Sequence, residues 1–158
     1  MGEVRVGLGF DSHPLGEGRP LRLGGIEFEG ETGLAGHSDG DVVSHALADA
    51  LLGAGALGDL GQHFPEEDPA IAGIGGLEIL ARVRTLLSDA ALEPVSCDLV
   101  VIAARPKLAE RRDEIRASLA GALGLSIGAV SVKATRPEGL GLEGDGIGCM
   151  AVALVTAA

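Results

Sequence analysis

The run Val4-Arg5-Val6-Gly7-Leu8-Gly9-Phe10-Asp11-Ser12-His13 decides how the amino-terminal part of this chain folds. Apolar residues alternate with other residues through it, which predicts a β-strand over residues 4–11 that ends at an Asp-x-His element. Side chains two positions apart on a strand point the same way, so Asp11 and His13 are expected to converge on one point. The strand therefore brings a carboxylate and an imidazole together.

A helix is predicted from Asp41 to Leu52, directly after the polar run His37-Ser38-Asp39-Gly40. Its apolar residues recur at helical spacing, and the polar run supplies suitable caps. Asp41, His45 and Asp49 stand four residues apart and form a polar stripe. We expect one of the two carboxylates to accept the proton of the second ring nitrogen of His45. The N–H groups of the polar run also predict an anion site at the start of the helix.

Asp11, His13 and His45 together would form a set of two imidazoles and one carboxylate. Such a set suits a divalent metal that keeps an open position for substrate. Zn²⁺ is the first choice for these ligands, with Mn²⁺ or Fe²⁺ as the alternatives. The competing interpretation is a polar strand end beside a buried core histidine. The acidic residues one turn away on each side of His45 favour the metal.

The composition restricts the partners of the chain. Twelve Lys and Arg against 23 Asp and Glu give the 158 residues a net charge of -11, which argues against nucleic acid and against a membrane surface. The length fits one domain, residues 1–158, and no apolar run approaches the roughly 18 residues of a membrane span. Without a charged and then apolar leader, the protein is expected to be cytoplasmic. Cys97 and Cys149 stand in apolar runs and are expected to be buried free thiols.

The rest of the chain alternates strand and helix patterns. We expect a hairpin of residues 21–23 and 26–28, a loop over 53–69, a helix over 77–91, a strand over 95–103, a helix from Pro106 to Leu123, and strands over 130–135 and 147–155. The predicted fold class is α/β, of the α+β sandwich type, with a single mixed β-sheet and helices packed on one of its faces.

Several longer motifs stand in order along the chain: Gly9-Phe10-Asp11-Ser12-His13, Ala35-Gly36-His37-Ser38-Asp39-Gly40-Asp41 with His45, Asp49-Ala50-Leu51-Leu52-Gly53-Ala54, Leu57-Gly58-Asp59-Leu60-Gly61, Phe64-Pro65 with Asp68-Pro69, Arg105-Pro106-Lys107-Leu108, and Lys133-Ala134-Thr135 with Glu138-Gly139-Leu140-Gly141. Over essentially the whole chain they resemble one family, the 2-C-methyl-D-erythritol 2,4-cyclodiphosphate synthases of the non-mevalonate isoprenoid pathway.

The resemblance implies a phosphorus–oxygen lyase. Its reaction converts 4-diphosphocytidyl-2-C-methyl-D-erythritol 2-phosphate into 2-C-methyl-D-erythritol 2,4-cyclodiphosphate and releases CMP. The family also implies a homotrimer with an active site at each subunit junction. The implied partners are therefore this nucleotide-linked substrate, CMP and two further copies of the chain, with no nucleic acid and no membrane.

The resemblance also implies a role for individual residues. Asp11, His13 and His45 would hold Zn²⁺, Glu138 would hold Mg²⁺ or Mn²⁺ on the diphosphate, and His37 and Arg136 are the candidate catalytic residues. The implied substrate-binding residues are Asp11, Ser12, His13, His37, Ser38, Asp59, Leu60, Gly61, Phe64, Pro65, Glu66, Glu67 and Asp68 around the methylerythritol phosphate; Ala103, Ala104, Arg105, Pro106, Lys107, Leu108 and Ala109 around the cytidine; and Thr135, Arg136, Pro137, Glu138 and Leu142 around the diphosphate.

Two stretches depart from the family pattern. Arg136-Pro137 stands where many members have a threonine-rich stretch, so Arg136 is a candidate to replace a hydroxyl contact with a charge. The segment 141–146 lacks an Arg that the family associates with isoprenoid diphosphate binding in the central cavity of the trimer. Two other functions fit the same metal ligands: a zinc phosphoesterase that activates water, and a non-catalytic, metal-stabilised trimer that binds small anions.

Overall fold

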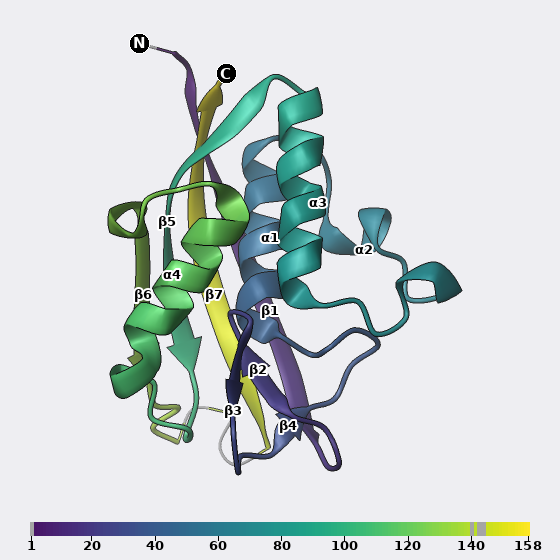
Figure 1. The fold of residues 1–158 in the computed structure, drawn as a ribbon, viewed down its shortest axis with the longest axis vertical. Coiled ribbons are helices and arrows are strands. Elements are labelled where there is room, and N and C mark those ends of the chain that lie inside the picture. Colours follow the sequence, from purple (N-terminus) through teal and green to yellow (C-terminus); the bar gives the residue numbers. More distant parts are fainter. Residues whose placement is uncertain (1, 140, 142–144) are drawn as a thin grey trace.

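The computed structural model describes residues 2–139, 141 and 145–158 of the chain. Its main sheet has five strands in the order β4-β1-β7-β5-β6 (Figure 1). The strands are β1 (Val4–Gly16), β4 (Gly33–Leu34), β5 (Leu92–Ile102), β6 (Val130–Thr135) and β7 (Gly146–Ala157). Strands β5 and β6 run parallel and the other pairs antiparallel, so the predicted mixed sheet is confirmed.

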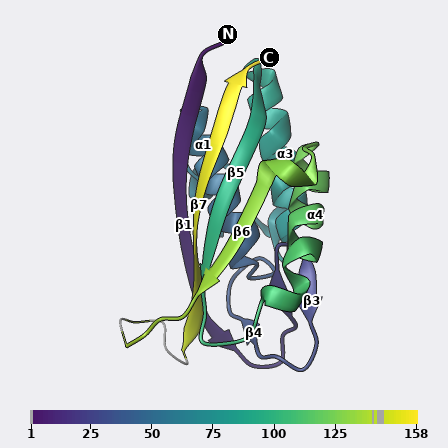
Figure 2. The same ribbon diagram turned by 90° about the vertical axis from the view of Figure 1, so that its left-hand side faces the viewer.

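The helices cover one face of this sheet, as predicted, and leave the other face open (Figure 2). They are α1 (Val42–Ala54), α2 (Leu60–His63), α3 (Gly76–Asp89) and α4 (Arg112–Leu123), with the 3-10 turns η1 (Pro69–Ile71), η2 (Ala109–Arg111) and η3 (Ile127–Ala129). Helix α1 is buried along almost its whole length between the sheet and α3. Among the described residues, no helix is long and apolar enough to cross a membrane.

Two glycines let strand β1 lie very close to helix α1. A Cβ atom on Gly7 would stand 1.9 Å from the carbonyl oxygen of Ala50, and one on Gly9 would stand 2.0 Å from that of Ala46. No larger side chain fits between these two backbones. Because Asp11 and His13 follow Gly9 on the same side of β1, the close approach carries them toward α1 as well.

The open face of the sheet is apolar along β1 and β7. Val6 and Leu8 are 65% and 64% exposed, and Phe10 and Met150, which pair across the two strands, are exposed beside them. On the covered face, Cys97 and Cys149 are buried free thiols, as expected. Burial raises the pKa of Cys97 to about 12 and raises the pKa of Cys149 as well, so both thiols stay protonated.

Several predicted boundaries differ from the structure. Strand β1 continues past the Asp-x-His element to Gly16, because residues up to Pro14 pair with β7 and Leu15 and Gly16 pair with β4. The fourth helix begins at Arg112, and Pro106 lies in the turn that precedes it. The predicted hairpin has the expected bounds, β2 (Leu21–Leu23) and β3 (Ile26–Phe28), but it forms its own two-stranded sheet.

Candidate metal centre and flanking pockets

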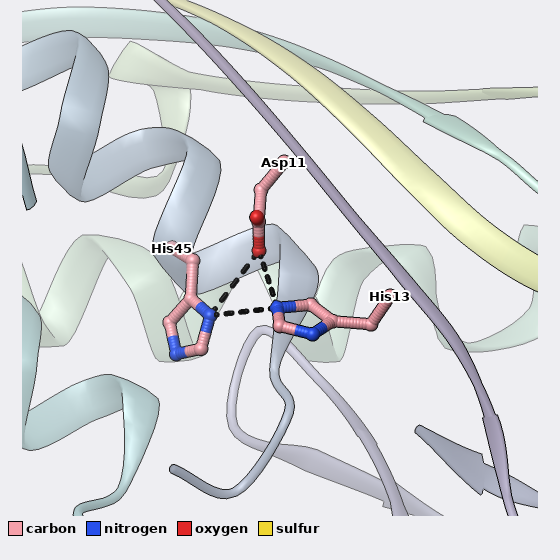
Figure 3. A group of neighbouring side chains, drawn as sticks. All are labelled: Asp11, His13 and His45. Carbon is pink, nitrogen blue, oxygen red and sulfur yellow. Dashed lines mark hydrogen bonds and ion pairs between the residues drawn. The ribbon is translucent and has the colours of Figure 1, made fainter. Parts of the chain in front are cut away.

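Asp11 and His13 on β1 meet His45 on α1, and their polar atoms point toward one another (Figure 3). The His13 Nε2 atom lies 2.8 Å from Asp11 Oδ2, and the His45 Nδ1 atom lies 3.2 Å from the same oxygen. The two ring nitrogens are 3.3 Å apart. Among the described residues, this is the group of acidic, His and Cys side chains close enough to share one metal ion.

These distances fit a divalent ion. Ligand atoms placed 2.0–2.2 Å from a tetrahedral zinc lie about 3.3 Å from one another. The three separations in the structure are 2.8, 3.2 and 3.3 Å, so a small adjustment of the Asp11–His13 contact would admit the ion. Three protein ligands leave the fourth tetrahedral position open, which is typical of catalytic rather than structural zinc sites.

The electrostatics of the triad favour positive charge at its centre. Burial raises the pKa of Asp11, but the hydrogen bonds with His13 and His45 outweigh burial and hold that pKa below its ordinary value of 3.8. The hydrogen bond to Asp11 raises the pKa of His13 above 6.5, although burial opposes this shift. A metal ion would supply the same positive charge without a proton.

The outer partner of His45 is a serine from the preceding loop. The Ser38 hydroxyl oxygen lies 3.0 Å from His45 Nε2, while the nearest carboxylate oxygen to that nitrogen, Asp39 Oδ1, is 3.9 Å away. The prediction that Asp41 or Asp49 fills this role is wrong. Asp49 accepts a hydrogen bond from the Leu60 N–H instead, which attaches α2 to α1.

Asp41 is the N-cap of α1 and is fully buried. Its carboxylate accepts hydrogen bonds from the N–H groups of Gly24, Gly25 and Ser44 and from the Ser44 hydroxyl. Burial, together with the charge of Asp39, raises the pKa of Asp41. The side chain therefore anchors the hairpin turn to the start of the helix and does not face the metal site.

Part of the predicted anion site at the start of α1 is filled by the chain itself. The N–H groups of Gly40, Asp41 and Ser44 bond to side chains of the same segment, and the Asp39 N–H bonds to the Ile74 carbonyl. These four N–H groups are therefore engaged within the protein, and an anion at the start of the helix would be bound by the others.

A pocket of about 170 Å³ opens beside the triad. Predicted site residues that line it are Asp11, His13, His37, Ser38, His45, Leu60, Gly61, Phe64 and Glu66, and the isoleucines 71, 74 and 79 complete the wall. His37 is exposed at this pocket. The structure therefore brings together most of the residues assigned to the methylerythritol phosphate end.

Of the residues assigned to the methylerythritol phosphate end, five lie outside the lining of this pocket: Ser12, Asp59, Pro65, Glu67 and Asp68. Ser12 is exposed and alternates away from Asp11 and His13 on β1. Asp59 caps α2 and Asp68 caps η1, each with a carboxylate that accepts a backbone N–H bond. Both carboxylates hold the loop whose neighbouring residues line the pocket.

A second, shallower pocket lies where β5 and β6 end and η2 begins. Its lining contains Ala103, Ala104, Pro106, Lys107, Leu108, Ala109, Thr135 and Arg136 from the predicted set, together with Ala134 and Arg112. Arg105 lies outside this lining, and its guanidinium forms two hydrogen bonds with the Glu31 carboxylate. The two pockets share no lining residue among the described parts of the chain.

Three cations line this second pocket: Lys107, Arg112 and Arg136. Most other cations of the chain are engaged, as in the pairs of Arg82 with Glu78 and of Lys133 with Asp98, whereas no described carboxylate lies within ion-pair distance of these three. Sequence reasoning missed Arg112, because a mixed-charge run on a helix surface is normally solvated. Only its position at the start of α4 reveals it.

The remaining predicted residues follow β6. Pro137 is buried and Glu138 is exposed, and neither lines the metal pocket. Glu138 has a positive φ of 52°, which is uncommon for a residue with a side chain. Leu142 lies outside the described residues.

The fold and the donor set define an α/β protein with a candidate metal centre between a strand and a buried helix. The chain belongs to the YgbB family, whose sequence model matches residues 4–158. Its similarity to named relatives agrees with this family assignment. It is 51% identical over 154 residues to the 2-C-methyl-D-erythritol 2,4-cyclodiphosphate synthase of Pelotomaculum thermopropionicum, covering 96% of this chain and 95% of that protein. The family resemblance seen in the motifs is confirmed.

Another relative is longer. The chain is 49% identical over 154 residues to the bifunctional enzyme IspD/IspF of an Anaeromyxobacter species, covering 96% of this chain but 40% of that protein. The chain thus spans about two fifths of the length of such bifunctional relatives. A solved structure of a 2C-methyl-D-erythritol-2,4-cyclodiphosphate synthase in a CDP-bound form is 36% identical, with a TM-score of 0.88 over 96% of this chain and 99% of that one.

Proposed function

We propose that residues 1–158 form one domain that converts 4-diphosphocytidyl-2-C-methyl-D-erythritol 2-phosphate into 2-C-methyl-D-erythritol 2,4-cyclodiphosphate with release of CMP. The observation that carries the proposal is the triad of Asp11, His13 and His45 at the edge of a pocket. The chain that carries this triad is 51% identical, over 96% of its length, to a 2-C-methyl-D-erythritol 2,4-cyclodiphosphate synthase.

The metal that fits the triad best is Zn²⁺, held by Asp11, His13 and His45, because this ligand set and these spacings suit it. When bound, such an ion supplies Lewis acidity toward a phosphoryl oxygen. Glu138 is the proposed ligand of Mg²⁺ or Mn²⁺ that arrives with the substrate diphosphate, since an exposed carboxylate suits these hard cations.

The reaction needs no protein nucleophile, because the 2-phosphate of the substrate attacks its own β-phosphate and CMP leaves. The side chains must therefore position two anions and offset their repulsion. His37 and Ser38 face the metal pocket and are the proposed contacts for the methylerythritol phosphate. His37 can donate a hydrogen bond to a phosphate oxygen, which makes it the proposed catalytic residue on this side.

The second pocket is the proposed cytidine diphosphate site. Backbone groups of residues 103–109 suit a base, and the chain has no Trp or Tyr to stack on one. Lys107, Arg112 and Arg136 place three positive charges where the diphosphate would enter. This supports a catalytic role for Arg136, which would stabilise the charge that develops as CMP leaves.

A homotrimer would join the two pockets. Among the described residues of one chain the two pockets share no lining residue, which supports a substrate held between two copies. The apolar open face of the sheet, with Val6, Leu8 and Phe10 exposed, supports burial against further copies. Each active site would then combine the triad of one subunit with the cytidine pocket of its neighbour.

Phosphorus NMR of the purified protein with the diphosphocytidyl substrate, Zn²⁺ and Mg²⁺ tests the proposal. We expect CMP and a cyclic diphosphate, and His45→Ala should abolish both products. If the reaction instead incorporates labelled oxygen from water into a linear phosphate, the protein is a zinc phosphoesterase. If the zinc-loaded protein binds the substrate without turnover, the protein is a non-catalytic assembly that binds anions.

A further inference from the structure

The loop over residues 35–40 carries His37 and Ser38 and lies outside every helix and strand. Contacts from elsewhere hold it instead. The Gly73 N–H donates to the His37 carbonyl over 3.1 Å, and the Gly76 N–H donates to Asp39 Oδ2 over 2.8 Å. These two bonds fix the side of the loop that faces α3.

Arg19 makes two further hydrogen bonds to this loop. Its Nη1 atom donates to the Gly36 carbonyl over 2.7 Å, and its Nη2 atom donates to the Ser38 carbonyl. The guanidinium thus forms hydrogen bonds with the carbonyls of the two residues that flank His37. Its planar fork is rigid, so two bonds from one group restrict both the position and the rotation of the loop. Arg19 is partly buried, which limits competition from water.

The hydrogen bonds of Arg19 connect the strand that carries Asp11 and His13 with the loop that contacts His45. Arg19 lies in the turn that follows β1, the strand that carries Asp11 and His13. The loop that it holds places the Ser38 hydroxyl 3.0 Å from His45 Nε2. A movement of the Ser38 backbone would therefore change the orientation of the third ligand.

Both Nη atoms of Arg19 are occupied by the loop carbonyls, which directs its guanidinium to the loop and not to a metal ligand.

We infer that Arg19 is a positioning residue of the metal and substrate site: through the Gly36 and Ser38 carbonyls it holds the loop so that Ser38 orients His45 and His37 faces the pocket. Its effect on turnover rests on the proposed function. Its effects on the loop and on zinc affinity do not.

Three variants test this inference: Arg19→Ala, Arg19→Lys, and Arg22→Ala as a matched control. Arg22 is an exposed arginine on the neighbouring strand β2, so its replacement removes the same charge nearby without touching the loop. The measurements are amide hydrogen exchange of residues 36–40, Zn²⁺ affinity by competition with a chromophoric chelator, and kcat and KM with the diphosphocytidyl substrate.

For Arg19→Ala we expect faster exchange at residues 36–40 and zinc affinity lowered about tenfold, the lower end of the effect of outer ligand partners. Turnover should show a fall in kcat larger than the rise in KM. Arg19→Lys keeps the charge but loses the fork, so it should recover only part of each effect. Arg22→Ala should resemble wild type.

Unchanged exchange and zinc affinity in Arg19→Ala would overturn the inference. Full recovery by Arg19→Lys, or an equal loss in Arg22→Ala, would also overturn it, because charge alone would then explain the effect. If the wild-type protein forms no cyclic product, the proposed function fails. The exchange and zinc measurements still decide the role of Arg19 in that case.

Discussion

Gly9 sets the distance between the strand and the helix that share the metal ligands. A Cβ atom there would stand 2.0 Å from the carbonyl oxygen of Ala46, the residue that follows His45. Gly9→Ala must therefore push β1 and α1 apart. We expect a loss of about 3 kcal/mol in the free energy of unfolding, at the upper end for overpacking, and weaker zinc binding. Denaturant unfolding and chelator competition measure the two effects.

Gly121 provides the control for that substitution. It lies in α4 with nothing within 4 Å of its added Cβ, so Gly121→Ala should raise the free energy of unfolding by about 0.5–1 kcal/mol. If Gly9→Ala proves as harmless as Gly121→Ala, the close packing of β1 on α1 does not set the metal site.

The Asp11–His13 pair predicts how the metal-free protein responds to pH. The pKa of His13 is raised in the folded state, so its stabilising effect is complete below 6.5 and is lost as the pH rises through the folded value. The pKa of Asp11 is lowered, so its effect is present above 3.8 and is lost as the pH falls. The pair therefore stabilises the protein most between these two values.

Unfolding of wild type and Asp11→Asn in a chelating buffer measures this contribution. The difference in free energy, about 1 kcal/mol for a partly exposed pair, should be largest near the middle of that range. It should shrink at alkaline pH. A difference that stays constant into the alkaline range would contradict the assigned pKa shifts.

At the scale of elements, the start of α1 depends on Asp41. Its carboxylate accepts bonds from the N–H groups of Gly24, Gly25 and Ser44 in a site closed to water. Asp41→Ala leaves these donors unpaired, so we expect a loss of about 3 kcal/mol in unfolding free energy. Asp59→Ala, which removes the exposed cap of α2, should cost about 1 kcal/mol. Equal losses in denaturant unfolding would show that the buried bonds to the hairpin add nothing.

How far the elements could be predicted depended on how local their signals are. The hairpin had the expected bounds because Gly24-Gly25 is a turn signal between two alternating runs. The extension of β1 to Gly16 could not be predicted from local sequence, since it comes from pairing with β7 up to Pro14 and with β4 at Leu15 and Gly16. Pro106 illustrates a signal with two meanings, because a proline suits both a first helical turn and an irregular turn.

The candidate site shows the same limit at closer range. Spacing correctly placed Asp11, His13 and His45 together. Spacing could not show that Asp41 turns back to cap its own helix, or that Ser38 is the partner of His45. Helical periodicity assigns a residue to a face, whereas the direction of a short side chain depends on which donors lie within its reach.

At the scale of the whole molecule, the open sheet face predicts assembly. Leu8 is 64% exposed on it, so Leu8→Glu should leave the fold of each subunit nearly unchanged while placing a charge in the proposed contact between copies. We expect wild type to sediment as a trimer and Leu8→Glu as a smaller species with unchanged circular dichroism. A wild-type protein that sediments as a monomer would contradict the proposed assembly.

A mixed assembly tests whether each active site is divided between subunits. His45→Ala removes a metal ligand, and Lys107→Glu combined with Arg112→Glu reverses two charges in the cytidine pocket, so each variant alone should be nearly inactive. Co-expression of the two chains under different tags yields mixed trimers. Some junctions then pair an intact triad from one chain with an intact cytidine pocket from the other. Random assembly should restore roughly a quarter of the wild-type turnover. Mixed trimers without turnover would place both halves of the site in a single chain, and the separation of the two pockets would then need a different explanation.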